Sequence, residues 1–511
     1  MQYQHAYPKS CCGLLGSTKL MGKNLRASLE PTNPERILLR GTAYNFLAEA
    51  LVLPTGLVTA AFLTRRLGPA DYGLYTLAAV TIAWLEWTIT AIFSRSAIKF
   101  VSEAEDWRPI GSAVFRWHLI VSLIAASGVF GGASILARLF NSEMLSGYLR
   151  IFALDIPLFG LARAHSTILM GLGSVNQRAL ACAARWITRL IFIILLVEAG
   201  FSVTGAIYGN IGASLIELSI TRYYIRPSIF CKNGINMGQF WNYSFALFAF
   251  VLSLRIFERI DLFALKTLGG TASQAGIYAA VQNLTLAPSL FGLALSPILL
   301  AVLSRDLYLG DTEKAKQKGS GAMRIVLLLA PFAGMCAGAS REIIMFLFGH
   351  SFQSAAPLLP PLMFGAVAMV MTSIAATILI AAGKPGWTFI LTAPIVPFAV
   401  TGNMIVIPRM GPMGASLVTF FLSCLAAMAT VLGVYKLWRI LPPFGSFCRS
   451  TLVTAVTSVV AFFWAIEGIW LIVKLACITC LIPVLLMSLG EFKSHEIAMI
   501  RSSFAFRVNS Q

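Results

Sequence analysis

Residues 63–80, LTRRLGPADYGLYTLAAV, place a Gly-Pro turn between two long apolar runs. The run before the turn covers about residues 37–63, and the run after it covers about residues 72–94. Each run is long enough to cross a bilayer core of about 30 Å as a helix. Gly-Pro is a strong turn signal, because glycine tolerates unusual backbone angles and proline has no amide hydrogen. The segment therefore predicts two consecutive membrane-spanning helices joined by a tight turn.

The same pattern recurs in the second half of the chain. LKTLGGTASQAGIYAAV at residues 265–281 places Gly276 and Tyr278 at a shift of 203 residues from Gly73 and Tyr75. Three further matches follow in the same order at shifts of 208 to 210: ILARLFNSEM with IIMFLFGHSF, ILMGLGSVN with ILIAAGKPG, and TGAIYGNIGAS with MGASLVTFFLS. The shift spans an even number of predicted helices, so the two halves share one orientation. The ordered set predicts two six-helix lobes that are parallel repeats.

The composition is that of a membrane protein. Of the 511 residues, 58% are hydrophobic and 12% are charged, and the mean hydropathy is +0.79. Soluble chains carry about 25% charged residues, so this chain has about half the charge that a water-facing surface needs. Soluble enzymes, nucleic-acid-binding proteins and disordered scaffolds are therefore excluded, although the net charge is +18.

The apolar runs and the charges between them predict the topology. Of the 39 Lys and Arg residues, 27 fall in the termini and every second loop, among them Arg178 and Arg185, and 7 fall in the other loops. Cytoplasmic loops are enriched in Lys and Arg, so both termini are expected in the cytoplasm. We predict an all-α integral membrane protein with about 14 transmembrane helices, at 37–63, 72–94, 112–136, 149–171, 177–198, 203–224, 239–265, 275–303, 321–340, 357–381, 386–408, 412–435, 450–466 and 469–490.

The predicted helices divide the chain into successive parts. A final helix pair lies outside the duplication, and no loop is long enough to fold as a domain of its own. The parts are a cytoplasmic N-terminal tail (1–36), an N-lobe (37–226), a cytoplasmic linker (227–238), a C-lobe (239–440), the final helix pair (450–490) and a cytoplasmic C-terminal tail (491–511).

This layout resembles the polysaccharide-biosynthesis and O-antigen flippase family of the multidrug/oligosaccharidyl-lipid/polysaccharide exporter superfamily. The resemblance covers about residues 37–440 and rests on LGPADYGLY at 67–75, on Asp261 followed by GIY at 276–278, and on GLG at 171–173. It implies two lobes in a V around a central cavity, which alternate between inward-open and outward-open states. It also implies a place in the cell inner (plasma) membrane.

Ionisable side chains inside the spans are the candidates for function, because each costs about 2.5–3.5 kcal/mol at a helix centre and usually faces a cavity or a partner. The helix at 239–265 is the densest, with Arg255, Glu258, Arg259 and Asp261 within seven residues. These charges either neutralise one another or place Arg255 and Arg259 in the cavity. Arginine binds phosphate oxygens bidentately, so such a lining would hold a pyrophosphate.

Two arginines of the N-lobe extend this hypothesis. Arg163 and Arg189 are candidates to complete a cationic, substrate-binding lining; the alternative for each is that it snorkels to the membrane interface. Lys474 lies outside the duplicated core, and we expect it to snorkel at the periphery. We expect Cys477 and Cys480 of the last helix to be buried packing residues.

Transport against a gradient requires energy, and the chain has no Walker-type phosphate-binding loop, so ion-coupled transport is expected. Coupling requires a carboxyl group that can gain and lose a proton or bind sodium. Glu49, five residues before a potential kink at Pro54, is the first candidate, and Asp261 and Glu86 follow. For Glu49 the alternative is a hydrogen bond to a neighbouring helix.

The sequence and the resemblance together predict a secondary-active flippase that moves a polyprenyl-diphosphate-linked oligosaccharide to the outer leaflet. Its expected partners are this lipid-linked anionic cargo, a proton or sodium ion, the bilayer and the polysaccharide polymerase machinery. No nucleic acid, cofactor, metal or catalytic residue is expected. The alternatives are a multidrug antiporter of the same superfamily, which the intramembrane cations disfavour, and a peptidoglycan-precursor flippase, for which Arg or Lys would be expected where Glu49 and Glu86 stand.

Overall fold

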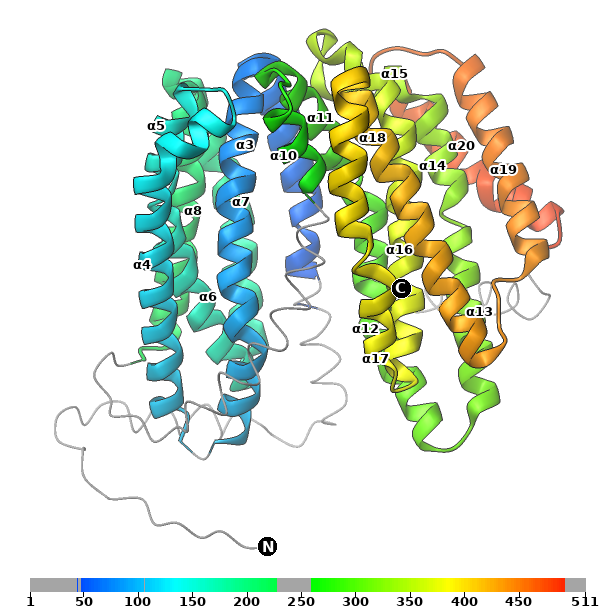
Figure 1. The fold of residues 1–511 in the computed structure, drawn as a ribbon, viewed down its shortest axis with the longest axis horizontal. Coiled ribbons are helices and arrows are strands. Elements are labelled where there is room, and N and C mark those ends of the chain that lie inside the picture. The colour runs from blue at the N-terminus through cyan, green and yellow to red at the C-terminus, as the bar shows by residue number, and fades with distance from the viewer. Residues whose placement is uncertain (1–43, 45–46, 105, 228–258, 492–511) are drawn as a thin grey trace, which may run out of the picture.

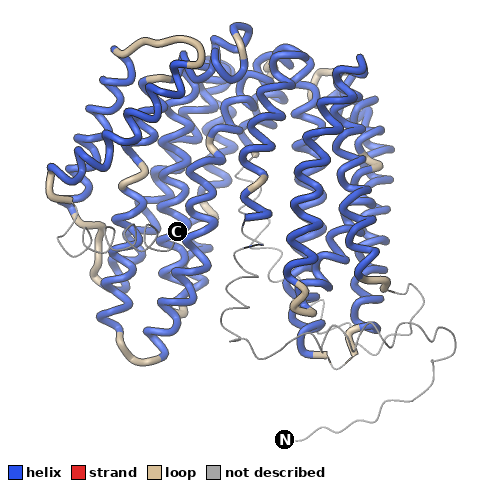
Figure 2. The backbone as a smooth tube through the Cα atoms, turned by 180° about the vertical axis from the view of Figure 1, so that it is seen from behind, coloured by secondary structure: helices blue, strands red, loops and turns tan. Residues whose placement is uncertain are grey.

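The computed structural model describes residues 44, 47–104, 106–227 and 259–491, and within these residues all regular structure is helical. Figures 1 and 2 show two helical bundles side by side. Ten helical runs in the described part are long and apolar enough to cross a membrane. The predicted all-α, multi-pass membrane protein is therefore confirmed.

The N-lobe is the bundle at the left of Figure 1. Its helices are α3 (Val52–Glu103), α4 (Arg108–Leu139), α5 (Met144–Phe152), α6 (Asp155–Gly171), α7 (Val175–Leu196), η1 (Val197–Phe201) and α8 (Ser202–Tyr224).

The C-lobe lies at the right of the same view. Its helices are α10 (Ile260–Thr267), α11 (Ala272–Leu284), α12 (Leu286–Tyr308), α13 (Thr312–Leu327), α14 (Ala330–Gly338), α15 (Ser340–Phe348), η2 (His350–Leu358), α16 (Leu359–Ala381), α17 (Pro385–Thr392) and α18 (Ile395–Trp438). The final pair, α19 (Phe444–Phe463) and α20 (Trp470–Ser488), packs on α13, α14 and α15 at the outer flank of this lobe.

Three glycines turn the chain inside otherwise continuous helical runs. Gly68, Gly200 and Gly411 have φ values of 73°, 94° and 57°, which a residue with a Cβ rarely adopts. They divide α3, the run from α7 to α8, and α18 at the boundaries predicted between successive spans. The total of 14 helices and the repeat layout stay predictions, because residues 228–258, which hold most of the span at 239–265, lie outside the described residues.

Several predicted loops are shorter than expected. Residues 95–111 and 304–320 were expected to be polar stretches between helices, but α3 continues to Glu103, α4 begins at Arg108 and α13 begins at Thr312. Lys, Arg and Glu are good helix formers, so helices can continue beyond the apolar part of the span. The single helix expected at 149–171 is instead broken between α5 and α6.

The two lobes contact one another at the end where α10, α11 and the bend of α3 meet, and their described helices diverge toward the opposite end (Figures 1 and 2). The repeat-related glycines Gly73 and Gly276 face each other in this contact. A Cβ on Gly73 would lie 1.9 Å from the Ala272 carbonyl oxygen, and one on Gly276 would lie 2.1 Å from the Pro69 carbonyl oxygen. The absence of side chains at both positions therefore allows the two backbones to touch.

We expect Gly276→Ala to separate the lobes at this end, because the added methyl group collides with backbone rather than with a movable side chain. A cysteine introduced at Tyr72, a residue 3% exposed in this contact, should then react with a water-soluble thiol reagent faster than in the Gly276 background. Gly321→Ala is the matched control, because a Cβ there has nothing within 4 Å. Equal labelling of the cysteine at position 72 in the Gly276, Gly276→Ala and Gly321→Ala proteins would show that the contact tolerates the methyl group.

The final helix pair is attached to the C-lobe by buried charges. Lys474 is fully buried, and its Nζ lies 3.0 Å from Glu342 Oε1, so the expected snorkelling position is wrong. Glu491, directly after α20, pairs with Arg324 of α13 at 2.6 Å and with Arg449 of α19 at 3.1 Å. Because one face of α20 packs on the lobe, its other face is free, and Cys477 and Cys480 lie exposed there rather than buried as expected.

Candidate functional site

A cavity of about 270 Å³ lies between the two lobes. Both halves of α3, together with α7, α11 and α12, supply most of its wall, and Arg259 borders it directly before α10. Two of its described lining residues are charged, and both are cations: Arg189 from the N-lobe and Arg259 from the C-lobe. The aromatic part of the wall consists of Tyr72, Tyr75, Trp84 and Trp87.

The two arginines are held differently. Arg189 projects from α7, where its Nη2 lies 3.5 Å from the Tyr75 hydroxyl and its Nε has no hydrogen-bond partner among the described residues. Arg259 Nη1 donates to Gln282 Oε1 at 2.9 Å. Most of the donor capacity of Arg189 is therefore uncommitted, and an oxyanion in the cavity can accept from it.

Asp261 is a buried residue next to Arg259, and it holds together helices of the C-lobe that adjoin the cavity. Its carboxylate is 3% exposed and accepts from the Tyr278 hydroxyl at 2.6 Å, from Gln282 Nε2 at 3.0 Å and from Thr419 Oγ1 at 3.1 Å. Gln282 thus joins Asp261 to Arg259, and the carboxylate fastens α10 to α11 and α18. The predicted ion-coupling role of Asp261 stays a prediction.

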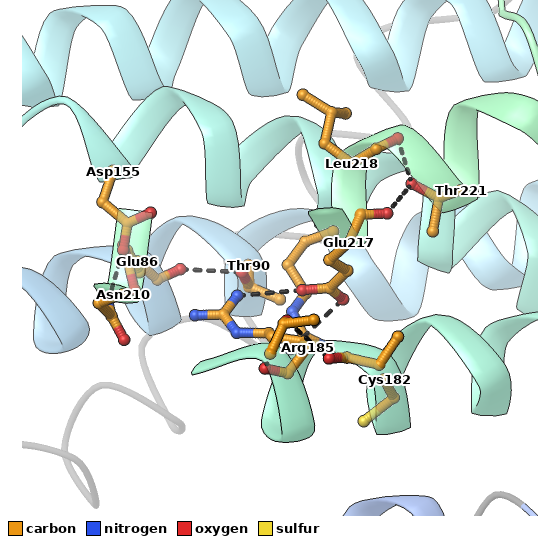
Figure 3. Close-up of polar contacts among 12 residues, drawn as sticks. Glu86, Thr90, Asp155, Cys182, Arg185, Asn210, Glu217, Leu218 and Thr221 are labelled. Carbon is orange, nitrogen blue, oxygen red and sulfur yellow. Dashed lines mark hydrogen bonds and ion pairs between the residues drawn. The ribbon is translucent and has the colours of Figure 1, made fainter. Parts of the chain in front are cut away.

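A second group of charges, which we call the N-lobe cluster, lies inside the N-lobe (Figure 3). Arg185 Nη1 donates to Glu217 Oε2 at 3.0 Å, and Arg163 lies 3.7 Å from Glu217 Oε1. Both guanidinium groups lie over the Phe159 ring, at 4.8 Å for Arg163 and 4.3 Å for Arg185. The cluster comprises Glu86, Asp155, Arg163, Arg185, Asn210 and Glu217.

The carboxyl end of this cluster is formed by Glu86 of α3 and Asp155 of α6. Asn210 Nδ2 of α8 donates to Asp155 Oδ2 at 2.7 Å. Figure 3 shows the guanidinium group of Arg185 between this carboxyl pair and Glu217. Glu86 is 5% exposed and Asp155 is fully buried, so this end of the cluster is closed to bulk water.

The structure brings some of the predicted site residues together and separates others. Arg189 and Arg259 border one cavity, whereas Arg163 is not among its lining residues and instead lies beside Glu217 in the N-lobe cluster. Glu49 Oε1 pairs with Arg178 Nη2 at 2.7 Å, which is the helix-to-helix contact considered as its alternative. Arg255 lies outside the described residues.

Four members of the cluster, Asp155, Arg185, Asn210 and Glu217, are not among the site residues predicted from the sequence. Arg185 was counted with a cytoplasmic loop, but it is 5% exposed in the middle of α7. It lies four residues before Arg189, and this spacing on one helix face was the available signal. Asp155 and Glu217 are ionisable residues inside predicted spans, but the sequence did not indicate a partner for either, and Asn210 carried no signal of its own.

A further contact between the lobes is made by Arg65, three residues before the turn at Gly68. Arg65 of α3 donates from Nε to the Leu347 carbonyl at 3.1 Å and from Nη2 to the Phe346 carbonyl, which are orphan acceptors at the end of α15. Phe140 at the end of α4 stacks on Phe263 of α10, with ring centroids 5.8 Å apart. These contacts join the lobes at the end that the charge distribution predicts to be external.

The comparisons with known proteins agree with this architecture. The Succinoglycan biosynthesis transport protein ExoT of Rhizobium meliloti (strain 1021) is 22% identical over 338 residues, which are 65% of this chain and 66% of that protein. A solved structure of the Lipid II flippase MurJ in an inward closed conformation superposes with a TM-score of 0.72 at 16% identity, over 88% of this chain and 98% of that one.

An outward-facing multidrug resistance MATE family transporter of the MOP superfamily superposes with a TM-score of 0.57 at 14% identity, over 83% of this chain and 97% of that one. At these identities the two structures show a shared fold. The family model described as "Polysaccharide biosynthesis protein" matches residues 62–357, which is more than half of the chain. The chain belongs to the polysaccharide biosynthesis protein family.

Proposed function

We propose that this protein is a secondary-active flippase that moves a polyprenyl-diphosphate-linked oligosaccharide to the outer leaflet of the cell inner (plasma) membrane. Both termini face the cytoplasm in this proposal, and the two lobes alternate about the central cavity. The observation that carries it is the pair Arg189 and Arg259, one from each lobe, in the wall of one cavity.

The chemistry of the cavity wall suits such a cargo. Two guanidinium groups on opposite sides can each take phosphate oxygens bidentately, and they do so without losing their charge. Because the two arginines belong to different lobes, a bound diphosphate bridges the lobes. The aromatic residues of the wall offer apolar surface beside these few polar groups, which is the usual composition of a ligand pocket.

The alternatives make different demands on the same wall. A cationic drug would be repelled by Arg189 and Arg259, and the described lining residues include no carboxylate to attract it. The family membership and the relative named for succinoglycan transport support a polysaccharide precursor over a peptidoglycan precursor. A polysaccharide polymerase in the same membrane is the expected acceptor of the exported unit.

The test is a leaflet-exchange assay in proteoliposomes that contain purified protein and a fluorescent diphosphate-linked oligosaccharide. Dithionite, which quenches the outer leaflet alone, measures how much cargo has crossed. We expect crossing in the wild-type vesicles and little crossing in empty vesicles. Efflux of a cationic dye without movement of the lipid-linked sugar would contradict the proposal and assign the protein to the drug antiporters.

A further inference from the structure

Two buried carboxyl groups of the N-lobe cluster face each other without a donor between them. Glu86 of α3 and Asp155 of α6 lie side by side where these two helices pack together (Figure 3). Glu86 Oε1 and Asp155 Oδ1 are both buried and have no hydrogen-bond donor among the described residues. Two ionised carboxylates at this separation repel strongly in a protein interior, so a cation must lie between them.

The charges around the pair lead to the same conclusion. The cluster holds two guanidinium groups, Arg163 and Arg185, against three carboxyl groups, Glu86, Asp155 and Glu217. Glu217 is paired with both arginines, so the Glu86–Asp155 pair carries the unbalanced charge. One added positive charge makes the buried cluster neutral, and neutrality removes much of the cost of its desolvation.

The other titratable groups packed around α3 do not provide this charge. His118 of α4 bonds through Nδ1 to the Val114 carbonyl, and His165 of α6 bonds to the Leu161 carbonyl, each on its own helix. Cys182 of α7 approaches the Ala48 carbonyl oxygen, at 3.9 Å. The charged groups that face the pair are Arg163 of α6 and Arg185 of α7.

The site suits a proton better than a metal ion. A hard cation takes several oxygen ligands, but the described residues contain no group of three or more acidic, His or Cys side chains with metal-binding geometry. Asn210 offers an N–H donor to Asp155, and Arg185 brings a second positive charge close. Ser214 lies one turn of α8 beyond Asn210, and its buried hydroxyl has no hydrogen-bond partner among the described residues, so a donor is available near Asp155 when the proton leaves.

The pair lies directly behind the cavity wall. Glu86 is on the same half of α3 as the lining residues Trp84 and Trp87. Arg185, which faces the pair, is one helical turn from Arg189, which faces the cavity. A change of one charge at the Glu86–Asp155 pair therefore changes the electrostatic potential at Arg189, which lies about two helical turns away.

We propose that Glu86 and Asp155 hold one proton between them and that this proton sets the strength of anion binding at Arg189. The proton adds positive charge behind the cavity wall, so the protonated protein binds a diphosphate more tightly. Because such coupling is reciprocal, diphosphate binding in turn promotes proton uptake at the pair. The coupling of this proton to diphosphate binding rests on the proposed function, whereas the sharing of the proton by Glu86 and Asp155 does not.

The shared proton is tested by infrared difference spectroscopy of the full-length protein in lipid between about pH 5 and about pH 9. We expect a protonated-carboxyl C=O band that persists at neutral pH, where ordinary carboxyl groups are ionised. Glu86→Gln and Asp155→Asn should each remove it, because either change leaves one carboxyl group that no longer shares a proton. Glu198→Gln is the matched control, since that carboxylate forms an exposed pair with Arg66. A spectrum without this band in the wild type would overturn the proposal.

The coupling is tested by the binding of a short polyprenyl diphosphate to the detergent-solubilised protein. A unit charge about 10 Å away at an effective dielectric constant of about 20 changes an affinity by about tenfold. The wild type should therefore lose about tenfold more affinity on raising the pH than Glu86→Gln does, because glutamine holds the pair at the single negative charge of the state with the shared proton. Equal pH dependence in both proteins would overturn the coupling.

Two further outcomes separate the parts of the argument. A wild type that shows the carboxyl band but binds no diphosphate at any pH would contradict the proposed function and leave the shared proton standing. Sodium that raises the affinity of the wild type at constant pH, and not that of Glu86→Gln, would replace the proton by sodium at this pair. The Glu86→Gln and Asp155→Asn side chains are close in shape to the native ones. An unchanged unfolding temperature would show that both variants fold normally.

Discussion

Replacing Arg189 and Arg259 together by alanine should reduce flipping of a diphosphate-linked oligosaccharide on the order of a thousandfold. A hydrogen bond to a charged group contributes about 1.5–3 kcal/mol, so the loss of each guanidinium group costs about tenfold to a hundredfold. Arg189 and Arg259 come from different lobes, so their contributions should combine. The flipping rates of the single variants should lie between those of the wild type and the double variant. The rate of Arg189→Lys should lie between those of the wild type and Arg189→Ala, because lysine keeps the charge but cannot bind an oxyanion bidentately.

The dithionite assay in proteoliposomes measures this effect directly. Arg66→Ala is the control, because Arg66 forms an exposed pair with Glu198 outside the cavity. Arg255→Ala belongs in the same series, since the sequence predicts that Arg255 acts with Arg259. Normal flipping by the Arg189→Ala/Arg259→Ala double variant and by Arg255→Ala would contradict a role in cargo binding. It would support the alternative that the charges of the helix at 239–265 only neutralise one another.

Glu217→Ala should destabilise the N-lobe by about 3–5 kcal/mol, which is the cost of leaving a buried charge without its partner. Glu217 is fully buried and is the counter-ion of both Arg163 and Arg185, so its removal leaves two guanidinium groups over one phenylalanine ring. We expect low yield in the membrane and a markedly lower unfolding temperature in detergent.

Two comparisons make this measurement specific. Glu198→Ala removes an exposed ion pair and should change stability by less than about 1 kcal/mol. A triple variant in which Glu217, Arg163 and Arg185 all become apolar should regain much of the loss, because no buried charge is left unpaired. An unchanged unfolding temperature for Glu217→Ala would mean that water reaches the two arginines.

The fold could be predicted because its determinants are local in the sequence. Long apolar runs define the spans, and Gly68, Gly200 and Gly411 mark turns that need unusual backbone angles. The break between α5 and α6 was not predicted, although Asp155 and Pro157 directly after it are residues that favour the first turn of a new helix. Polar stretches were read as loops because composition shows where a helix leaves the membrane and not where it ends.

The site could be predicted only in part, because its chemistry depends on how helices pack around each lobe. Arg163 and Arg189 look alike in the sequence, each a single cation in an apolar span. Packing directs Arg189 into the cavity and Arg163 toward Glu217, and periodicity along one helix does not reveal which neighbour that helix faces. The approach of Glu86 to Asp155 is likewise a contact between helices far apart in the chain.

Because α20 is attached to the C-lobe, labels on this helix can be used to measure movement of one lobe relative to the other. Lys474 and Glu491 fix both ends of this helix to the C-lobe, so a dye or spin label on it must travel with that lobe. Cys477 and Cys480 already present thiols on its outer face. Paired with a label on the exposed side of α4, at the opposite flank in Figure 1, they would report the angle between the lobes without a probe in the transport path.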